Sequence, residues 1–419
     1  MDYREYMSKK ILVVVDSINE NAGSGAKANL AFIQNLQGAG YTVTVYHYTQ
    51  LEIQVPEVAC INIPEKKGTL LFILSRIQRL LARWTGININ PWIEERLGFS
   101  FTYLNDVKSI LNVLSKIKSE SFDLLITLSQ AASFRPHHAL LELSQWHSKW
   151  MAYVHDPYPF ECYPPPYNWT EKGAVQKKRF FQRVSEKARY SGFPSLLLQE
   201  WMGQFFPKFL QTGKVIPHQL VPTLMTNNQP SPLLESGKFV LLHAGSLLKQ
   251  RDPKGLLDGY NLFLQHHPEA AETSQLMLVG AGGYHDAMLK EYATRIPSVK
   301  VISQNVPFDQ VLSLQSRVSV NIILEAIAPI SPFLPGKFPH CVMADKPILS
   351  LAPNRSETHR LLGDEYPYWS EQDDVERIAH TLGTLYEQWK RNPEALHLNR
   401  PDLITYLGHQ QLQKILDTL

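Results

Sequence analysis

The sequence has few cysteines, little net charge and no long apolar run. The three cysteines among 419 residues, Cys60, Cys162 and Cys341, are odd in number and far apart, so they predict neither a disulfide framework nor a zinc cluster. The formal net charge of +2 lacks the basic excess of a general nucleic-acid binder, and we expect no nucleic-acid partner. No apolar run approaches the roughly 20 residues that span a bilayer.

The N-terminal apolar run is short and is followed directly by Asp16, unlike the apolar core of a secretory signal. Together with the scarcity of cysteine, this favours a cytoplasmic protein in a reducing compartment. At roughly 100–200 residues per domain, the length predicts two or three domains.

Short apolar runs alternate with helical segments along the whole chain. In the first half the expected strands are 11–15, 41–46, 122–128 and 150–155, with a polar loop at 16–27 that leads into a helix at 26–38. In the second half they are 239–245, 276–280, 299–302, 318–324 and 347–351. Such runs between helices predict doubly wound parallel sheets. The polar, proline-containing run 226–236 has the composition of a linker, so the predicted domains are 1–225 and 238–401.

The segment 331–350, SPFLPGKFPHCVMADKPILS, combines a Pro/Gly-rich loop, Lys337, a short helix and an apolar strand. Backbone N–H groups at a helix start and a lysine ammonium together neutralise phosphates. The alternative is a plain strand-loop-helix crossover. The order of features resembles the donor-site segment of retaining glycosyltransferases of the GT-B fold, of the group 1 or family 4 type, where a glutamate usually stands in place of His340.

Further segments resemble the same family in order and spacing. They are 245–257, GSLLKQRDPKGLL, the glycine turn 279–283, the loop 304–311, the glycine loop at Gly23-Ser24-Gly25 and His155-Asp156-Pro157. The resemblance implies two Rossmann-like domains facing a cleft, an acceptor-side domain followed by a nucleotide-sugar donor domain. It also implies a last helix, 402–419, that packs back on the first domain.

The resemblance and the residue types together suggest a donor site. Charge grows on the diphosphate as the glycosidic bond breaks, so fixed cations stabilise the transition state. Arg251 and Lys337 are the first candidates and Lys254 is the reserve; solvated surface charges are the alternative. The backbone of Gly245 and Ser246 is expected beside the phosphates. Asn305, Val306 and His340 are expected beside the nucleoside.

The first domain supplies the candidates nearer to the sugar. Gly23, Ser24 and Gly25 can present backbone N–H groups to phosphates or sugar, or they form a flexible connector. His155 ends a strand, where ligands bind in open α/β sheets. Its imidazole, or Asp156, is the catalytic candidate; a turn capped by Asp156 is the alternative.

The change from glutamate to His340 alters the hydrogen bonding available to a ribose, because a neutral imidazole offers one donor and one acceptor. Glu325, at the end of the strand 318–324, is a candidate for the missing carboxylate from another backbone position, although no family motif places a carboxylate there. The same change favours a non-catalytic nucleotide-sugar binding protein, one of two alternatives to a transferase. The other is a sugar-nucleotide epimerase or hydrolase of the same fold.

The segment 68–84, GTLLFILSRIQRLLARW, has Arg76, Arg79 and Arg83 at helical spacing among apolar residues. It is interpreted either as a helix lying in a membrane interface or as a core helix whose arginines face solvent. The first interpretation suits a lipid-linked acceptor at the inner face of a membrane.

We therefore expect a GT-B glycosyltransferase of polysaccharide biosynthesis. It transfers a hexose from a nucleoside diphosphate sugar to a glycan or lipid-linked acceptor. Since no Asp-x-Asp signature lies in a suitable loop, we expect no metal and no cofactor besides the donor substrate.

Overall fold

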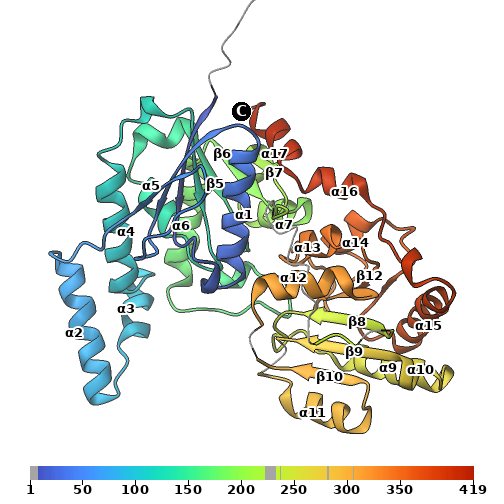
Figure 1. Ribbon diagram of the computed structural model, residues 1–419. Helices are drawn as coiled ribbons and strands as arrows, with labels where there is room; N and C mark the ends of the chain where they lie inside the picture. Colours follow the sequence, from blue (N-terminus) through green and yellow to red (C-terminus); the bar gives the residue numbers. More distant parts are fainter. Residues whose placement is uncertain (1–7, 222–232, 236, 281–282, 305) are drawn as a thin grey trace, which may run out of the picture. The chain divides into compact units, whose positions relative to one another are not determined.

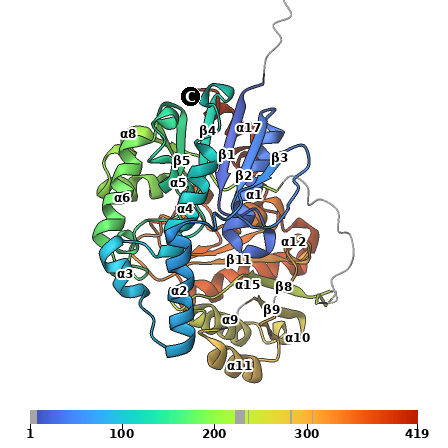
Figure 2. The ribbon, with the colours of Figure 1, turned by 90° about the vertical axis from the view of Figure 1, so that its left-hand side faces the viewer.

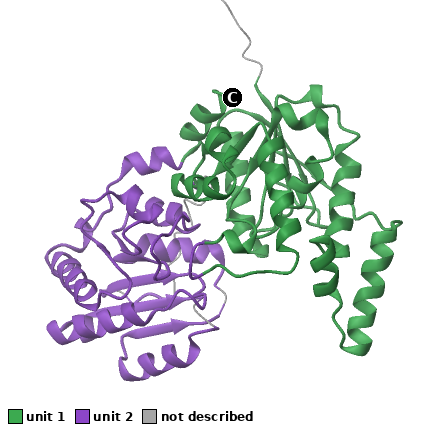
Figure 3. Ribbon diagram, turned by 180° about the vertical axis from the view of Figure 1, so that it is seen from behind, with its two compact units in different colours: residues 1–163, 167–219, 408–419 green, residues 164–166, 220–407 purple. Residues whose placement is uncertain are grey.

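The computed structural model divides into two compact units, each with its own parallel sheet (Figures 1 and 3). It describes residues 8–221, 233–235, 237–280, 283–304 and 306–419. Unit 1 comprises 1–163, 167–219 and 408–419, and unit 2 comprises 164–166 and 220–407. Most of the sequence between the predicted domains, 222–232 and 236, lies outside the described residues.

The sheet of unit 1 has seven parallel strands in the order β3-β2-β1-β4-β5-β6-β7. Their bounds are β1 Lys10–Val15, β2 Thr42–His47, β3 Ala59–Asn62, β4 Leu124–Leu128, β5 Trp150–Tyr153, β6 Tyr190–Phe193 and β7 Gly213–Val215. β1 lies at the centre, with Ile11 beside Val43 on one side and Leu124 on the other. Because β1 and β4 are buried along almost their whole length, they read as continuous apolar runs.

Helices cover both faces of this sheet, since successive strand residues point to opposite sides. Leu12 and Val14 face α4 Phe101–Leu114, α5 Arg135–Leu140, α6 Ala174–Lys187, α7 Leu196–Phe205 and α8 Lys208–Thr212. Ile11, Val13 and Val15 face α1 Ser24–Gly38 and α17 His409–Leu416. Two further helices, α2 Leu70–Thr85 and α3 Asn90–Leu97, lie outside this layer, where α2 contacts α4 and α3 contacts α6 (Figure 2).

The sheet of unit 2 has six parallel strands in the order β10-β9-β8-β11-β12-β13. They are β8 Phe239–Ala244, β9 Ser274–Val279, β10 Val299–Ile302, β11 Val320–Leu324, β12 Ile348–Leu351 and β13 Trp369–Ser370. One face packs on α9 Lys254–His266, α10 Ala270–Thr273, α11 Asp286–Arg295 and α15 Val375–Arg391. The other packs on α12 Phe308–Arg317, α13 Phe338–Met343, α14 Glu357–Leu362 and α16 Pro401–Tyr406. Two doubly wound parallel sheets are thus confirmed.

Two local expectations were wrong. Ser24 and Gly25 belong to the first turn of α1, and only Gly23 precedes the helix, with φ +110°. The expected helix 402–419 is two helices, α16 and α17, which meet at Leu407 and Gly408. α16 belongs to unit 2, whereas α17 packs in unit 1, where the Tyr41 hydroxyl donates to Asp417 at 2.6 Å.

No helix among the described residues is both long and apolar enough to cross a bilayer.

Candidate functional site

In unit 2, the carboxyl ends of β8 and β9 form tight glycine turns. Gly245 has φ +135° and Gly280 has φ +72°, conformations that favour glycine. The amide of Gly245 donates to Val279 O at 2.8 Å. A Cβ on Gly245 would lie 3.0 Å from Lys337 Nζ. This glycine is therefore required both by its backbone conformation and by the close approach of the lysine.

Lys337 lies directly before α13, and its ammonium donates to His243 Nε2 at 2.9 Å. Nε2 of His243 is consequently the acceptor, which makes the imidazole neutral with its proton on Nδ1. Burial, and next the positive charge of Arg251, lowers the pKa of Lys337 to about 7. Burial, followed by the charges of Lys337 and Arg251, lowers the pKa of His243 well below its ordinary value. Lys337, Arg251 and His243 are thus one electrostatic cluster.

A buried carboxyl group belongs to the same cluster. Glu325 immediately follows β11 and accepts a hydrogen bond from the Ser331 hydroxyl. Burial raises the pKa of Glu325, while Ser331, Thr358 and Arg251 act in the opposite direction. The charge of Glu325 also acts on Lys337. Two cations and one carboxyl group are therefore held beside the glycine turn, at the edge of the sheet where ligands of open α/β folds bind.

The other donor candidates of unit 2 differ in their surroundings. Ser246 is exposed after Gly245. Lys254 opens α9 and pairs with Asp258, which also accepts from the Tyr292 hydroxyl. The ammonium of Lys254 is thus paired with a carboxylate of its own helix, whereas the ammonium of Lys337 donates to His243.

The nucleoside candidates lie around α12 and α13. Asn305 lies outside the described residues. Val306 is half-buried before α12. His340, in α13, packs edge-on against Phe308 with ring centroids 5.2 Å apart. The structure brings His340 and Phe308 together as a ring pair, where the family resemblance would place a carboxylate.

In unit 1, the start of α1 faces the turn after β4. A Cβ on Gly25 would meet Gln130 Cγ at 3.1 Å, whereas one on Gly23 would meet no atom within 4 Å. Asn29, one turn further along α1, donates from Nδ2 to Ser129 O at 3.2 Å. The first turn of α1 and its N–H groups are therefore fixed at the carboxyl end of β1 and β4, where the helix dipole favours anions.

His155 lies two residues after β5 and is 7% exposed. Its Nε2 lies 2.7 Å from Asn29 Oδ1. Because Asn29 uses its amide nitrogen on Ser129 O, its oxygen must accept, so the proton of His155 sits on Nε2 and Nδ1 carries the lone pair. The ring stacks on His218 with centroids 5.4 Å apart. Burial, and next the neighbouring histidines, lowers the pKa of His155 well below its ordinary value.

Asp156 follows His155 and is half-buried. Its charge adds to the burial that raises the pKa of Tyr163. Asp156 therefore lies close enough to Tyr163 to affect its ionisation, while His155 is hydrogen-bonded to Asn29.

Several site residues were missed by the sequence analysis. His243 is a titratable residue inside the otherwise apolar strand β8, and the sequence alone shows this interruption. Asn29 is a buried amide on the apolar face of α1, and Asp16 follows a buried strand and is bound by Ser133 and Arg135. Polar residues that interrupt or directly follow a buried strand are the signal that would have found them.

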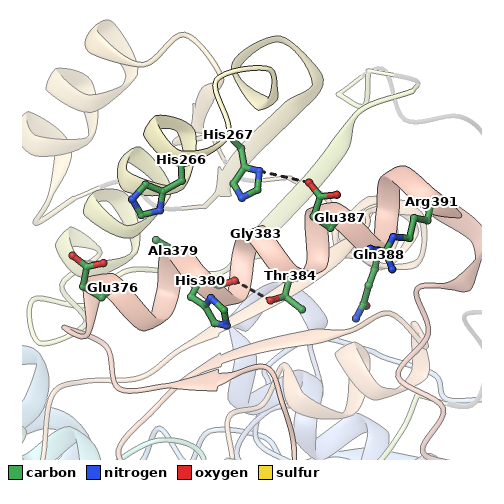
Figure 4. Close-up of a pocket in the computed structure, with 10 residues that line it drawn as sticks. All are labelled: His266, His267, Glu376, Ala379, His380, Gly383, Thr384, Glu387, Gln388 and Arg391. Atoms are coloured by element: carbon green, nitrogen blue, oxygen red, sulfur yellow. Dashed lines mark hydrogen bonds and ion pairs between the residues drawn. The ribbon is translucent and has the colours of Figure 1, made fainter.

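A separate surface hollow of about 570 Å3 lies in unit 2 between the end of α9 and α15 (Figure 4). His267 and Glu387 line this hollow. Together with the neighbouring Glu269 they are the one group of three in the described residues that could hold a metal ion. Lys390 Nζ already lies 2.6 Å from Glu387 Oε1 and 3.2 Å from Glu269 Oε1. Phe239, the first residue of β8, packs on Tyr386 of α15, so the hollow lies at the amino edge of the sheet, opposite Lys337.

Comparison with known proteins identifies the fold. No protein-family model and no curated sequence matches the chain. Solved structures do match over nearly the whole length. The UDP-forming α,α-trehalose-phosphate synthase from Burkholderia xenovorans has a TM-score of 0.64 at 10% identity, with 98% of each chain covered. The fold is GT-B.

Two other structures match the chain with similar sequence identity and TM-score. The enzyme from Burkholderia vietnamiensis has a TM-score of 0.62 at 10% identity, covering 99% of this chain and 100% of its own. The Escherichia coli protein bound with UDP-2-fluoro glucose has a TM-score of 0.58 at 13% identity, with 98% of both chains covered. At these identities the likeness establishes the GT-B architecture predicted for the chain.

Proposed function

We propose that the protein is a glycosyltransferase that takes a hexose from a nucleoside diphosphate sugar. The observation that carries this proposal is the cluster of Lys337, Arg251 and His243 beside Gly245. Burial, and next the positive charge of Arg251, disfavours the charged form of Lys337 and lowers its pKa. An anion bound close to Lys337 would favour the charged form. A diphosphate supplies the missing negative charge.

The two cations have different roles. Arg251 can bind two phosphate oxygens in parallel, while Lys337 acts as a compact charge positioned by His243. Negative charge grows on the leaving diphosphate, so both stabilise the transition state more than the bound donor. With two protein cations at the diphosphate, we propose a reaction that needs no divalent metal.

We also propose which residues contact the nucleoside and the phosphates. Val306, Asn305 and His340 receive the nucleoside, with the His340 ring supplying one donor and one acceptor to the ribose or base. The backbone of Gly245 and Ser246 meets the phosphates. Lys254 remains a weaker candidate, because Asp258 engages it. The charge of Glu325 favours the charged form of Lys337.

Unit 1 supplies the groups for the sugar. The N–H groups around Gly23, Ser24 and Gly25 bind anionic or hydroxyl oxygens at the start of α1. His155 accepts a hydrogen bond at Nδ1 from a sugar hydroxyl, in the neutral form that its burial enforces. In a retaining reaction the leaving phosphate deprotonates the acceptor, so His155 and Asp156 position the sugar and do not act as a strong base.

The acceptor that we propose is a glycan or a lipid-linked glycan, in a cytoplasmic pathway of polysaccharide synthesis. The similar structures suggest further compounds to test. They include a UDP-forming synthase and a complex with glucose-6-phosphate. UDP and a sugar phosphate therefore belong among the first compounds tried.

The experiment is a thermal-shift panel of nucleoside diphosphates and their sugars, followed by product analysis with the donor that binds. A ligand that binds the folded state raises its stability by RT ln(1 + [L]/Kd). Transfer of labelled sugar to an acceptor supports the proposal. Free sugar or an isomerised donor without transfer would indicate a hydrolase or epimerase, and binding without turnover a non-catalytic protein; either result would overturn the transferase assignment.

A further inference from the structure

The helix α2 exposes six large apolar residues, whereas its two fully buried residues are polar. Six large apolar residues at helical spacing are exposed, among them Leu70 at 71% and Trp84 at 79%. The interpretation of this segment as a core helix is therefore wrong. The exposed stripe, which we call the α2 stripe, consists of Leu70, Ile73, Ile77, Leu80, Leu81 and Trp84.

Hydrogen bonds attach the buried face of α2 to the rest of unit 1. Ser75 and Gln78 are the buried residues of the helix. The Gln78 amide donates to Asn90 of α3, and the Thr69 hydroxyl at the start of α2 donates to Asn105 of α4. These hydrogen bonds fix the rotation of the helix about its axis, so the α2 stripe is held toward solvent.

The apolar surface continues beyond α2. Ile87, in the connection to α3, is 61% exposed, and Trp92 in α3 is 73% exposed. Both views of the ribbon show α2 at the outer side of unit 1 (Figures 1 and 2). An apolar surface of this extent, with two exposed tryptophans, marks an interaction site.

The charges beside the stripe select its partner. α2 contains Arg76, Arg79 and Arg83 and no acidic residue, and helical spacing places the three along one flank of the α2 stripe. All three are exposed. Arg76 contacts Glu65 at 3.5 Å at the protein side of that flank. A surface with an apolar stripe and a basic flank is complementary to a layer with anionic headgroups above acyl chains.

We infer that α2, extended by Ile87 and Trp92, docks flat on an anionic lipid bilayer. The apolar side chains enter the boundary between headgroups and acyl chains, where tryptophan is favoured. The arginines extend along the surface and keep their charges among the headgroups. A second copy of the chain fits less well, because a twofold contact would bring the basic flanks together with no acidic residue on α2 to pair them.

The inference does not depend on the donor site of unit 2, and its test uses no substrate. The full chain is sedimented with vesicles of phosphatidylcholine alone and with vesicles that also contain phosphatidylglycerol. We expect binding to the anionic vesicles, weakened by salt because exposed charges are screened. Absence of binding to anionic vesicles at low salt overturns the inference.

Two sets of variants separate charge from apolar contact. Arg76→Gln, Arg79→Gln and Arg83→Gln together should lower the partition coefficient by about fivefold per arginine. The control with the same charge loss is Lys290→Gln, Arg317→Gln and Arg391→Gln, exposed in unit 2, which should bind as the parent does. Equal loss in this control overturns the inference.

Ile77→Ser, Leu80→Ser and Trp84→Ser change exposed side chains, so the fold should survive and vesicle binding should disappear. Val175→Ser, Leu210→Ser and Ile404→Ser, exposed elsewhere, form the control. Sedimentation velocity supplies the second measurement. A dimer that the α2 stripe variants dissociate, together with no vesicle binding, would identify a protein interface and overturn the inference.

Discussion

At the scale of single residues, the protonation state of Lys337 should respond most strongly to a bound ligand. Its folded pKa of about 7 compares with an ordinary value of 10.5, so at pH 8 much of the population is uncharged. A bound diphosphate favours the ammonium, because an opposite charge at close range stabilises the charged form. Binding is therefore coupled to proton uptake.

Affinity for a nucleoside diphosphate should fall as the pH rises from 7 to 9. The diphosphate contributes little to this change, since its last ionisation lies near pH 6. Titration calorimetry at pH 8 in two buffers of different ionisation enthalpy should report net proton uptake. In Lys337→Arg, whose charge is permanent, the uptake should vanish. Equal proton uptake in the parent and this variant would contradict the assigned role.

Asn29 holds His155 in one tautomer, and Nδ1 of His155 is buried with no hydrogen-bond partner among the described residues. We propose that a sugar hydroxyl donates to this Nδ1. We expect His155→Ala to reduce turnover by about 10²–10⁴-fold, the range of a positioned proton-transfer or hydrogen-bonding group. Affinity for the nucleoside diphosphate should stay nearly unchanged, since that ligand is assigned to unit 2. Steady-state kinetics and calorimetry on the same variant test both statements. Full activity in the alanine variant would remove His155 from the site.

At the scale of elements, the central strands were predictable. The short strands β3, β6, β7 and β13, toward the edges of the sheets, were missed, and so was the orientation of a helix. Buried strands such as β1 and β4 read as uninterrupted apolar runs. α2 has the same period whether its apolar face packs inward or outward, and the hydrogen bonds that decide, to Asn90 and Asn105, come from other elements. Ser24 and Gly25 have loop composition, yet they form the first turn of α1.

The candidate site was predictable only in part, because some of its residues are brought together by contacts between elements that are distant in the sequence. Local motifs singled out Lys337 and Arg251 as candidates. The partner of Lys337, His243, is separated from it by 94 residues, and only the pairing of strands in the sheet brings them together. The break at Gly408 was missed because the apolar pattern of α16 continues into α17, although the two helices pack in different units.

The glycine turn after β8 gives a prediction for an element. In Gly245→Ala, the new Cβ would lie 3.0 Å from Lys337 Nζ. The backbone there has φ +135°, which an alanine rarely adopts. We expect a loss of about 1–3 kcal/mol from the strained backbone and weaker binding of the nucleoside diphosphate. Gly363→Ala, at φ +95° with no atom within 4 Å of its Cβ, is the matched control for strain alone. Equal nucleotide affinity in the two variants would contradict the role of the turn.

At the scale of the whole molecule, buried neutral histidines set the response to acid. Burial lowers the pKa of His137 to about 3, and that of His138 and of His218 to about 4. The unfolded chain binds protons near pH 6.5 where these folded side chains do not, so stability falls as the pH drops below that value. All three lie in unit 1, as does His155.

Calorimetry should therefore show a lower Tm at pH 5.5 than at pH 7.5, with the larger shift in the transition of unit 1. Three buried carboxyl groups, Asp16, Asp106 and Glu325, have raised pKa values and act in the opposite direction. These groups take up protons in the folded state at a pH above their ordinary pKa values of 3.8 to 4.5. That uptake stabilises the folded state in acid and offsets part of the stability lost through the histidines. A Tm that is unchanged between the two pH values would contradict this assignment of neutral histidines.

The central claim is that unit 2 binds a nucleoside diphosphate through Arg251 and Lys337. The most direct measurement is calorimetric titration of the nucleoside diphosphate selected by the thermal-shift panel into the parent chain, Arg251→Ala, Lys337→Ala and the control Lys290→Ala. We expect each site variant to lose about 2–4 kcal/mol of transition-state stabilisation in turnover and to bind the diphosphate more weakly, with the control unchanged. Parent-like affinity and turnover in both site variants would contradict the account.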